Sequence, residues 1–242
     1  MGHVNATAQF WQIKHASLAG LWQNCRMQQT REQIIGQIEQ AQAALPQAVP
    51  VRLVAVSKRQ PVAAIRALYA QGQRDFGENY LQEGLEKITA CQDLEICWHF
   101  LGAIQSNKTR AIAEQFDWVH TVDRFKIARR LSEQRPADRP PLNILLQVNI
   151  DAQPSKAGVE PDAVAELVAQ VQTLERVQLC GLMCIPKPGN SAAFDDLAQL
   201  NAALAEPLPH LSMGMSADFA QAVAAGATLV RVGTALFGPR DS

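Results

Sequence analysis

The sequence lacks an excess of charge of either sign. Its 242 residues include 22 lysines and arginines against 23 aspartates and glutamates, a formal net charge of -1. A protein that binds nucleic acid or an anionic membrane through its overall charge carries a clear basic excess. We therefore expect neither nucleic acid nor a membrane as a partner, although one local basic pocket for a phosphate is compatible with these numbers.

Long apolar runs are missing as well. No stretch approaches the ~20 apolar residues that a membrane-spanning helix needs, and the first residues, MGHVNATAQF, lack the basic-then-apolar pattern of a secretory signal. Cysteine is scarce, with five residues at irregular spacing, and an odd, scattered set is typical of a reducing compartment. The sequence predicts a cytoplasmic protein.

Only Cys180 and Cys184 are closely spaced among the cysteines. Residues four apart on a regular strand point to the same face of the sheet, so we expect these two thiols to share a face. No second cysteine or histidine pair accompanies them, and a structural zinc site needs four such ligands. We predict no metal site and interpret both cysteines as small buried apolar residues.

The chain instead contains a regular alternation of short apolar and longer amphipathic segments. Hydrophobic residues make up 48% of it, enough for a large core. Several short segments are apolar throughout, as in parallel strands that are buried on both faces. The predicted strands span residues 51–57, 74–78, 98–104, 117–122, 143–150, 177–185, 210–215 and 229–236. Helical patterns lie between them at residues 61–72, 82–92, 109–116, 124–134, 161–174, 192–206 and 218–227.

Repeated strand–helix units predict an α/β fold, a single (β/α)8 TIM-type barrel, with an open doubly wound sheet as the alternative. We expect one domain over residues 1–242, with the barrel at about 51–242 and a helical N-terminal extension at 1–50. Residues 30–45 of the extension should pack one apolar face on the barrel, formed by Ile34, Ile35, Ile38, Ala41 and Leu45. The less regular residues 1–26 are an appendage to which the sequence assigns no role.

In such a barrel, functional groups gather where the strands end at their carboxyl side. The first predicted strand runs into Lys58. Its amine would point into the mouth of the barrel, where it could attack an aldehyde. The alternative is an ordinary solvated lysine, since most lysines are exposed.

A phosphate site is predicted at the ends of the seventh and eighth strands. Ser216 falls at the start of a helical pattern, and Gly233 and Thr234 end the eighth strand. Hydroxyls and amides beside a helix N-terminus bind phosphate, and barrels often place phosphate here; a helix cap and a plain glycine turn are the alternatives. Arg231 should share the inward face of its strand with Gly233, and an inward arginine needs a partner.

Two histidines and two methionines near the barrel mouth have competing interpretations. His99 is expected to face the interior, either as a hydrogen-bonded core residue or as a cofactor contact. We interpret His120 as a structural hydrogen-bonding residue. Met213 and Met215 should share one strand face, and we interpret both as packing residues.

Taken together, these motifs resemble those of the pyridoxal phosphate homeostasis proteins, one-domain barrels similar to the N-terminal barrel of bacterial alanine racemase. The resemblance covers about residues 30–242 in order, through the motifs AVSK (55–58), FGENYLQE (76–83), WHFLGAIQSNK (98–108), HTVDR (120–124), NIDAQPSKAG (149–158), GLMCIP (181–186), LSMGMSADF (211–219) and VRVGTALFG (230–238). It implies that the chain binds pyridoxal 5'-phosphate (PLP). Its implied binding residues are Lys58 as the Schiff-base lysine, Ser216, Gly233 and Thr234 at the phosphate, Arg231 at the ring nitrogen and Asn79 beside the cofactor.

Three functions compete on these observations: PLP homeostasis, an amino-acid racemase, and an aldolase that uses Lys58 on a sugar phosphate. A racemase needs a base on each face of the cofactor. In alanine racemase, as the resemblance implies, a tyrosine of a further domain supplies one of them, and we expect that domain to be absent here. An arginine at the ring nitrogen also weakens the electron sink. An aldolase needs acidic partners, for which Glu78 and Asp123 are candidates.

We therefore expect a monomeric PLP-binding protein without efficient catalysis and without catalytic residues. Its expected partners are PLP itself and, as candidate recipients of the cofactor, PLP-dependent apoenzymes.

Overall fold

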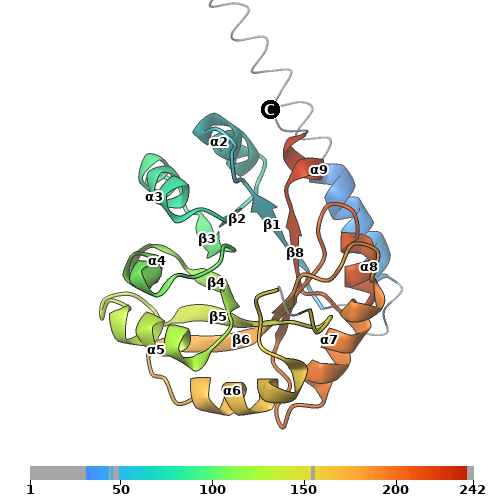
Figure 1. Ribbon diagram of the computed structural model, residues 1–242. Helices are drawn as coiled ribbons and strands as arrows, with labels where there is room; N and C mark the ends of the chain where they lie inside the picture. The colour runs from blue at the N-terminus through green and yellow to red at the C-terminus, as the bar shows by residue number, and fades with distance from the viewer. Residues whose placement is uncertain (1–30, 44, 46–48, 154–155, 239–242) are drawn as a thin grey trace, which may run out of the picture.

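A closed barrel of eight parallel strands forms the centre of the molecule, as the sequence predicts (Figure 1). The computed structural model describes residues 31–43, 45, 49–153 and 156–238. The strands follow one another around the barrel in chain order, and β1 closes against β8, with Leu53 beside Val230. They are β1 (Arg52–Val56), β2 (Asp75–Glu78), β3 (Cys97–Phe100), β4 (Trp118–Val122), β5 (Leu142–Val148), β6 (Val177–Cys184), β7 (His210–Ser212) and β8 (Leu229–Val232).

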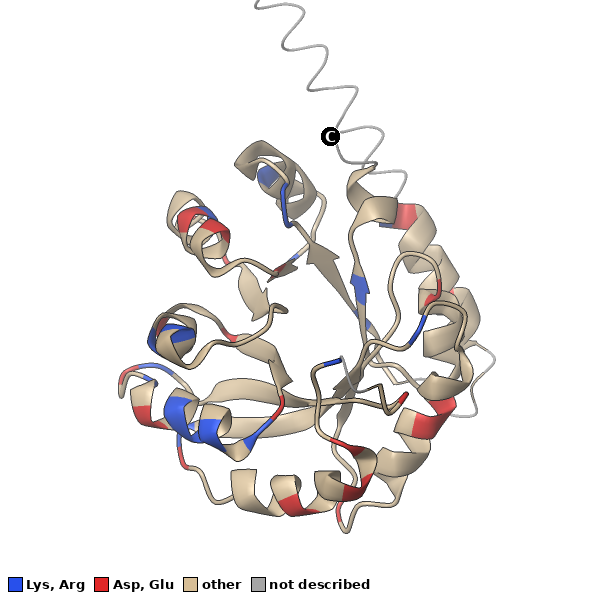
Figure 2. Cartoon of the chain, viewed as in Figure 1, with Lys and Arg blue, Asp and Glu red and all other residues tan. Residues whose placement is uncertain are grey.

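A ring of helices surrounds the barrel (Figure 1). It consists of α2 (Val62–Ala70), α3 (Leu81–Ala90), α4 (Thr109–Gln115), α5 (Phe125–Gln134), α6 (Val164–Val171), α7 (Ala192–Ala202), α8 (Phe219–Ala224) and the short α9 (Thr234–Phe237), with 3-10 turns at Ser106–Lys108 and Pro161–Ala163. Charged residues lie mainly on these helices and their loops (Figure 2). Among the described helices, none has both the length and the apolar character that crossing a bilayer requires.

The last two strands are shorter than predicted. The predicted strand 210–215 ends at Ser212, because Gly214 adopts a φ of +88° that extended backbone does not have. The predicted strand 229–236 ends at Val232, and Thr234 begins α9 instead of ending the strand. A hydrogen bond of 3.0 Å from the Arg231 N–H to the Gly214 carbonyl joins the two strand ends.

Two apolar clusters are separated by the barrel wall. The larger lies between the barrel and the helices and includes Leu53 and Ala55 of β1. The smaller includes Val54, which lies between those two residues in the chain, together with Leu145, Met183 and other residues of the strands. Since successive side chains of a strand point to opposite faces, the smaller cluster fills the inside of the barrel.

The prediction that Cys180 and Cys184 share a face is wrong. The pairing of β5 with β6 steps from Ile144 and Leu179 to Leu145 and Gly181, so Cys180 is an extra residue in a β-bulge. A one-residue slip reverses the face of every following side chain. Cys180 accordingly belongs to the inner cluster and Cys184 to the outer one.

The helix before the barrel is described over residues 31–42. Ile34 and Ile38 are buried in the outer cluster, with Ile35 and Ala41 packed against it at lower burial. These residues of the predicted apolar face therefore contact the barrel, whereas Leu45, also predicted for this face, lies beyond the end of the helix. The appendage at residues 1–26 lies outside the described residues.

Candidate functional site

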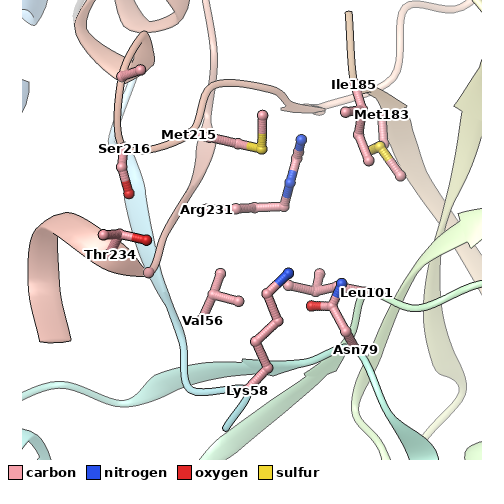
Figure 3. A pocket seen from close by; sticks show the side chains of 12 residues that line it. Val56, Lys58, Asn79, Leu101, Met183, Ile185, Met215, Ser216, Arg231 and Thr234 are labelled. Carbon is pink, nitrogen blue, oxygen red and sulfur yellow. The ribbon is translucent and has the colours of Figure 1, made fainter. Parts of the chain in front are cut away.

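A cavity of about 450 Å³ opens at the carboxyl end of the barrel (Figure 3). Its wall contains all of the residues that the sequence nominates for the site, namely Lys58, Asn79, Ser216, Arg231, Gly233 and Thr234. The rest of the lining is apolar: Val56, Leu101, Met183, Ile185, Met215 and Ala217. The volume lies within the roughly 300–1,000 Å³ range of small-molecule sites, and an apolar wall with a few convergent polar groups is their usual composition.

Lys58 follows the end of β1 and extends its amine into the cavity (Figure 3). The turn that carries it is held on both sides, by a 3.0 Å hydrogen bond from the Ser57 N–H to the Gly77 carbonyl and by the Arg59 N–H, which donates to Glu83. Arg59 has a φ of 60°, uncommon for a residue other than glycine. Among the described residues, the Lys58 amine has no hydrogen bond or ion pair, so it is free to meet a ligand.

A buried charged cluster supports this turn from behind. The Lys87 amine donates to the Ser57 carbonyl at 2.6 Å, to Glu78 at 2.8 Å and to Glu83 at 2.6 Å. The Ser57 hydroxyl donates to the same oxygen of Glu78 at 2.6 Å. Burial raises the pKa of Glu78 although both of these hydrogen bonds oppose the shift. The cluster ties the end of β1 to the end of β2 and keeps the backbone beside Lys58 in place.

Asn79 lies just past the end of β2, in register with Lys58 past the end of the neighbouring β1, and its amide lies beside the Lys58 amine at the cavity (Figure 3). Its side-chain oxygen is buried and, in the part of the chain that the structure describes, has no hydrogen-bonding partner. Gly102 lies so close to the Asn79 carbonyl that a Cβ there would approach its oxygen to 2.0 Å. An orphaned buried acceptor is rare, and here it indicates that a ligand group belongs beside it.

The predicted phosphate site is assembled from two loops. Ser216 lies in the turn that precedes α8, close to the predicted start of this helix, and Thr234 begins α9. The Ser216 hydroxyl accepts a 3.3 Å hydrogen bond from the Ala235 N–H, which brings both hydroxyls to one end of the cavity (Figure 3). A Cβ at Gly214 would collide with Ala222 at 2.6 Å, so the close approach of this loop to α8 requires glycine.

Arg231 reaches the cavity from β8, on the inside of the barrel (Figure 3). Its guanidinium donates to the Ser212 hydroxyl at 2.6 Å and to the Cys184 carbonyl at 2.9 Å. The side chain is 6% exposed, and burial lowers the pKa of the group. The sequence predicted an inward arginine with a partner, and both partners are neutral oxygens.

Sequence reasoning misjudged several neighbours of these residues. Met215, interpreted as a packing residue, is 40% exposed and lines the cavity, whereas Met213 is buried in the outer cluster, because Gly214 breaks the strand between them. His99 is a hydrogen-bonded core residue and does not line the cavity. Sequence reasoning missed the cavity residues Leu101 and Ile185, because only their position just after a strand distinguishes them in the sequence.

Comparison with known proteins identifies relatives over almost the whole described chain. The family described as alanine racemase, N-terminal domain, matches residues 30–241. A pyridoxal phosphate homeostasis protein of Pseudomonas aeruginosa is 54% identical over 208 residues, which cover 84% of this chain and 90% of that protein. One from Vibrio cholerae is 50% identical over 228 residues, 89% of this chain and 97% of that protein.

Solved structures with the same fold include PipY of Synechococcus elongatus with PLP bound, at 41% identity and a TM-score of 0.74, covering 84% of this chain and 99% of that one. The alanine racemase of E. faecalis has a TM-score of 0.63 and 18% identity, over 89% of this chain and 59% of that one. At that identity the racemase likeness concerns the fold alone.

Proposed function

The chain belongs to the family of pyridoxal phosphate homeostasis proteins, on the fold of the alanine racemase N-terminal domain, and we propose that it holds PLP covalently on Lys58. In this proposal the protein serves the homeostasis of the cofactor and does not use it for efficient catalysis. PLP-dependent apoenzymes are the proposed recipients, and the proposed form is a monomer in the cytoplasm. The unpaired state of the four described cysteines supports that compartment.

The observation that carries the proposal is the convergence of three kinds of group on one cavity. A free amine at Lys58, two hydroxyls at Ser216 and Thr234, and the donor-only guanidinium of Arg231 match the aldehyde, the phosphate and the ring nitrogen of PLP. The unpartnered oxygen of Asn79 supplies a further polar contact. When bound, PLP supplies an aldehyde that condenses with a primary amine and an electron-withdrawing pyridine ring.

The composition of the cavity wall favours holding the cofactor over racemisation. Two-sided proton transfer needs two bases, and among the described lining residues only Lys58 can act as one. Tyr80 is half exposed, under the Arg59 guanidinium, and does not line the cavity. Arginine keeps its protons, so Arg231 would donate to the ring nitrogen and leave it unprotonated, which weakens the ring as an electron sink.

The aldolase alternative loses its acidic partners. Glu78 is fully buried and bonded to Lys87 and Ser57, and Asp123 is paired with Arg124 at 2.7 Å. Neither carboxyl group lines the cavity. A sugar phosphate bound at Lys58 would therefore find no general acid within the described wall.

Covalent attachment is tested by borohydride reduction of the PLP-loaded protein followed by peptide mass spectrometry. We expect the pyridoxyl mass on Lys58, and its loss, together with the loss of yellow colour, in Lys58→Ala. Lys108→Ala, which removes an exposed lysine beyond the end of β3, is the matched control and should keep both signals. A label that stays at full stoichiometry in Lys58→Ala would refute the assignment.

The absence of efficient turnover is tested separately, by proton NMR of alanine or serine with the loaded protein in heavy water. We expect slow exchange at the α-carbon and no build-up of the opposite enantiomer. Fast exchange accompanied by racemisation would replace homeostasis by the racemase alternative while leaving Lys58 as the attachment site.

A further inference from the structure

A hydrogen-bonded path crosses the inside of the barrel and ends at Arg231. It starts at Asp75 on β2, whose Oδ1 lies 3.0 Å from His99 Nε2, and it continues from His99 Nδ1 to His120 Nε2 at 2.9 Å. His120 Nδ1 lies 2.9 Å from Ser212 Oγ, which accepts the 2.6 Å hydrogen bond from Arg231. This interior path joins a carboxylate at the amino end of the barrel to the guanidinium in the cavity wall.

Both histidines on the interior path are neutral. His99 and His120 are fully buried, and burial lowers the pKa of each below its ordinary value of 6.5. Burial acts in the opposite direction on Asp75, but hydrogen bonds from His99 and Arg52 hold the pKa of this carboxyl below its ordinary value. At neutral pH the path therefore has a carboxylate at one end, two neutral rings and a hydroxyl between, and a cation at the other end.

The chemistry of the two end groups determines the position of every proton between them. The carboxylate of Asp75 can only accept, so His99 donates to it through Nε2–H and must accept at Nδ1. His120 then donates through its own Nε2–H and accepts at Nδ1 from the Ser212 hydroxyl. Since arginine can only donate, Ser212 Oγ accepts from it. All donors point from Arg231 toward Asp75, and the path has one self-consistent direction.

The interior path also contributes to the balance of the Arg231 charge, together with Asp218. Burial lowers the pKa of this guanidinium, and the Asp218 carboxylate opposes that shift through space. Within residues 31–43, 45, 49–153 and 156–238, no carboxylate contacts this guanidinium, whose partners are the Ser212 hydroxyl and the Cys184 carbonyl. A buried cation without an opposite charge is unfavourable. A chain of aligned hydrogen bonds in a low-dielectric interior is polarised along its length, so it transmits part of the compensation from Asp75.

The amino end of the path is not a metal centre. Ligand atoms of Asp75, Cys97 and His99 lie within 4.8 Å of one another, as a metal site requires. However, the Arg52 guanidinium donates to both Asp75 and Cys97 and already places a positive charge there. Burial and the nearby Asp75 raise the pKa of the Cys97 thiol to about 12, so it is protonated beside Arg52.

We propose that Asp75, His99, His120 and Ser212 are positioning residues that hold the Arg231 guanidinium in one orientation against the cofactor ring. The inference rests on the proposed function, in which Arg231 faces the ring nitrogen of PLP. Breaking the path at His120 removes the acceptor of the Ser212 hydroxyl. The Ser212 side chain can then rotate, and its oxygen is no longer fixed as the acceptor for Arg231. Arg231 keeps only the Cys184 carbonyl as a fixed partner, and its contact with the ring changes.

The direction of the path is tested without any cofactor. Nitrogen-15 NMR of the labelled protein, freed of PLP, reports which ring nitrogen of each histidine carries the proton. We expect His99 and His120 to be protonated on Nε2 alone at neutral pH. The opposite tautomer or a doubly protonated ring at either residue would overturn the proposal whether or not the protein binds PLP.

The effect on the cofactor is tested with matched variants of His120. His120→Phe keeps the ring shape but removes donor and acceptor, and His120→Gln keeps one donor and one acceptor on a shorter group. His210→Phe is the control, because the His210 ring contacts Trp118 as the His120 ring does, but it bonds to Thr228, outside the path. We expect His120→Phe to shift the absorption band of bound PLP and to weaken its binding about tenfold, the effect of one lost hydrogen bond.

His120→Gln should restore part of the band position and affinity, and His210→Phe should leave both unchanged. If wild type binds PLP on Lys58 while His120→Phe has the wild-type spectrum and affinity, the positioning role is refuted and the proposed function stands. If His120→Gln and His120→Phe shift the spectrum equally, the effect is one of packing, which also overturns the proposal. If wild type itself does not bind PLP, the proposed function fails, whereas the NMR result still decides the direction of the path.

Discussion

The two ends of the barrel are built in opposite ways. At the amino end, Arg52 bonds to Asp75 and Cys97, and Trp118 stacks on His99 with ring centroids 5.6 Å apart, so polar groups and rings have partners. At the carboxyl end, the Lys58 amine and the Asn79 oxygen have none among the described residues. Met215 and Ile185 line the cavity there and are 40% and 38% exposed.

The residues that stabilise the fold and the residues that can bind a ligand therefore lie at opposite ends of the same sheet. Saturated contacts at the amino end contribute to the free energy of folding, whereas unsatisfied groups at the carboxyl end are available to a ligand. Truncations at the amino end should therefore reduce stability, and truncations in the cavity should reduce PLP binding.

The largest expected effect tests the carboxyl end. Ser216→Ala combined with Thr234→Val removes both hydroxyls of the phosphate site, at roughly 1.5–3 kcal/mol for each hydrogen bond to a charged group. PLP affinity should then fall about 10²- to 10⁴-fold, as measured by titration, with pyridoxal, which lacks the phosphate, little affected.

Thr228→Val is the matched control at the amino end, where the Thr228 hydroxyl bonds to His210 and to the Leu211 N–H. It should lower stability and leave the ratio of PLP to pyridoxal affinity unchanged. An equal loss of both ligands in the double variant would place the phosphate elsewhere and remove the distinction between the two ends.

A smaller effect is expected from one truncation at each end. Leu229 is fully buried inside the barrel near its amino end, and Leu229→Ala should cost about 2–5 kcal/mol of the free energy of unfolding. Met215→Ala, in the cavity wall, should change it by less than about 0.5 kcal/mol. Urea denaturation of both variants without PLP measures the difference, and comparable losses would mean that the rim is as tightly packed as the core.

The smallest effect concerns the pH dependence of stability. Burial lowers the pKa of His120 in the folded protein well below 6.5. Between that lowered pKa and 6.5, the unfolded chain therefore binds a proton at this residue that the folded chain does not. Its contribution to stability is therefore complete above 6.5 and is lost as the pH falls below that value, by at most about 1.4 kcal/mol per pH unit. His99 acts in the same direction.

His120→Gln does not titrate, so its stability should fall less steeply than that of wild type between about pH 6.5 and 5. Burial raises the pKa of Glu78, which acts in the opposite direction above 4.5, but both proteins carry it and the comparison cancels its contribution. Urea unfolding across this range measures the two slopes. Identical slopes would show that His120 is not held neutral in the folded protein.

Local patterns were sufficient for much of the architecture. The sequence pattern predicted each of the strands from β1 to β8, several of them from apolar runs, and the alternation of these segments with amphipathic ones favoured a closed barrel. The position of Lys58 just past the first strand and the inward face of Arg231 on the last strand predicted that both would reach one cavity, as they do. The ends of the last two strands were less predictable. The positive φ of Gly214 and the start of α9 at Thr234 both depend on how the last loops pack.

The sequence by itself determined the strands, the helices between them and the residues near the carboxyl ends of the strands, because side-chain periodicity is a property of the chain. It left an open doubly wound sheet as the alternative to a barrel, and the tertiary structure decided for closure. Tertiary structure alone decided that a bulge at Cys180 turns it away from the face of Cys184. It also decided that His99, His120 and Ser212 meet in one path to Arg231. These contacts join residues up to 92 positions apart, and their geometry depends on the closure of the barrel, which no local pattern encodes.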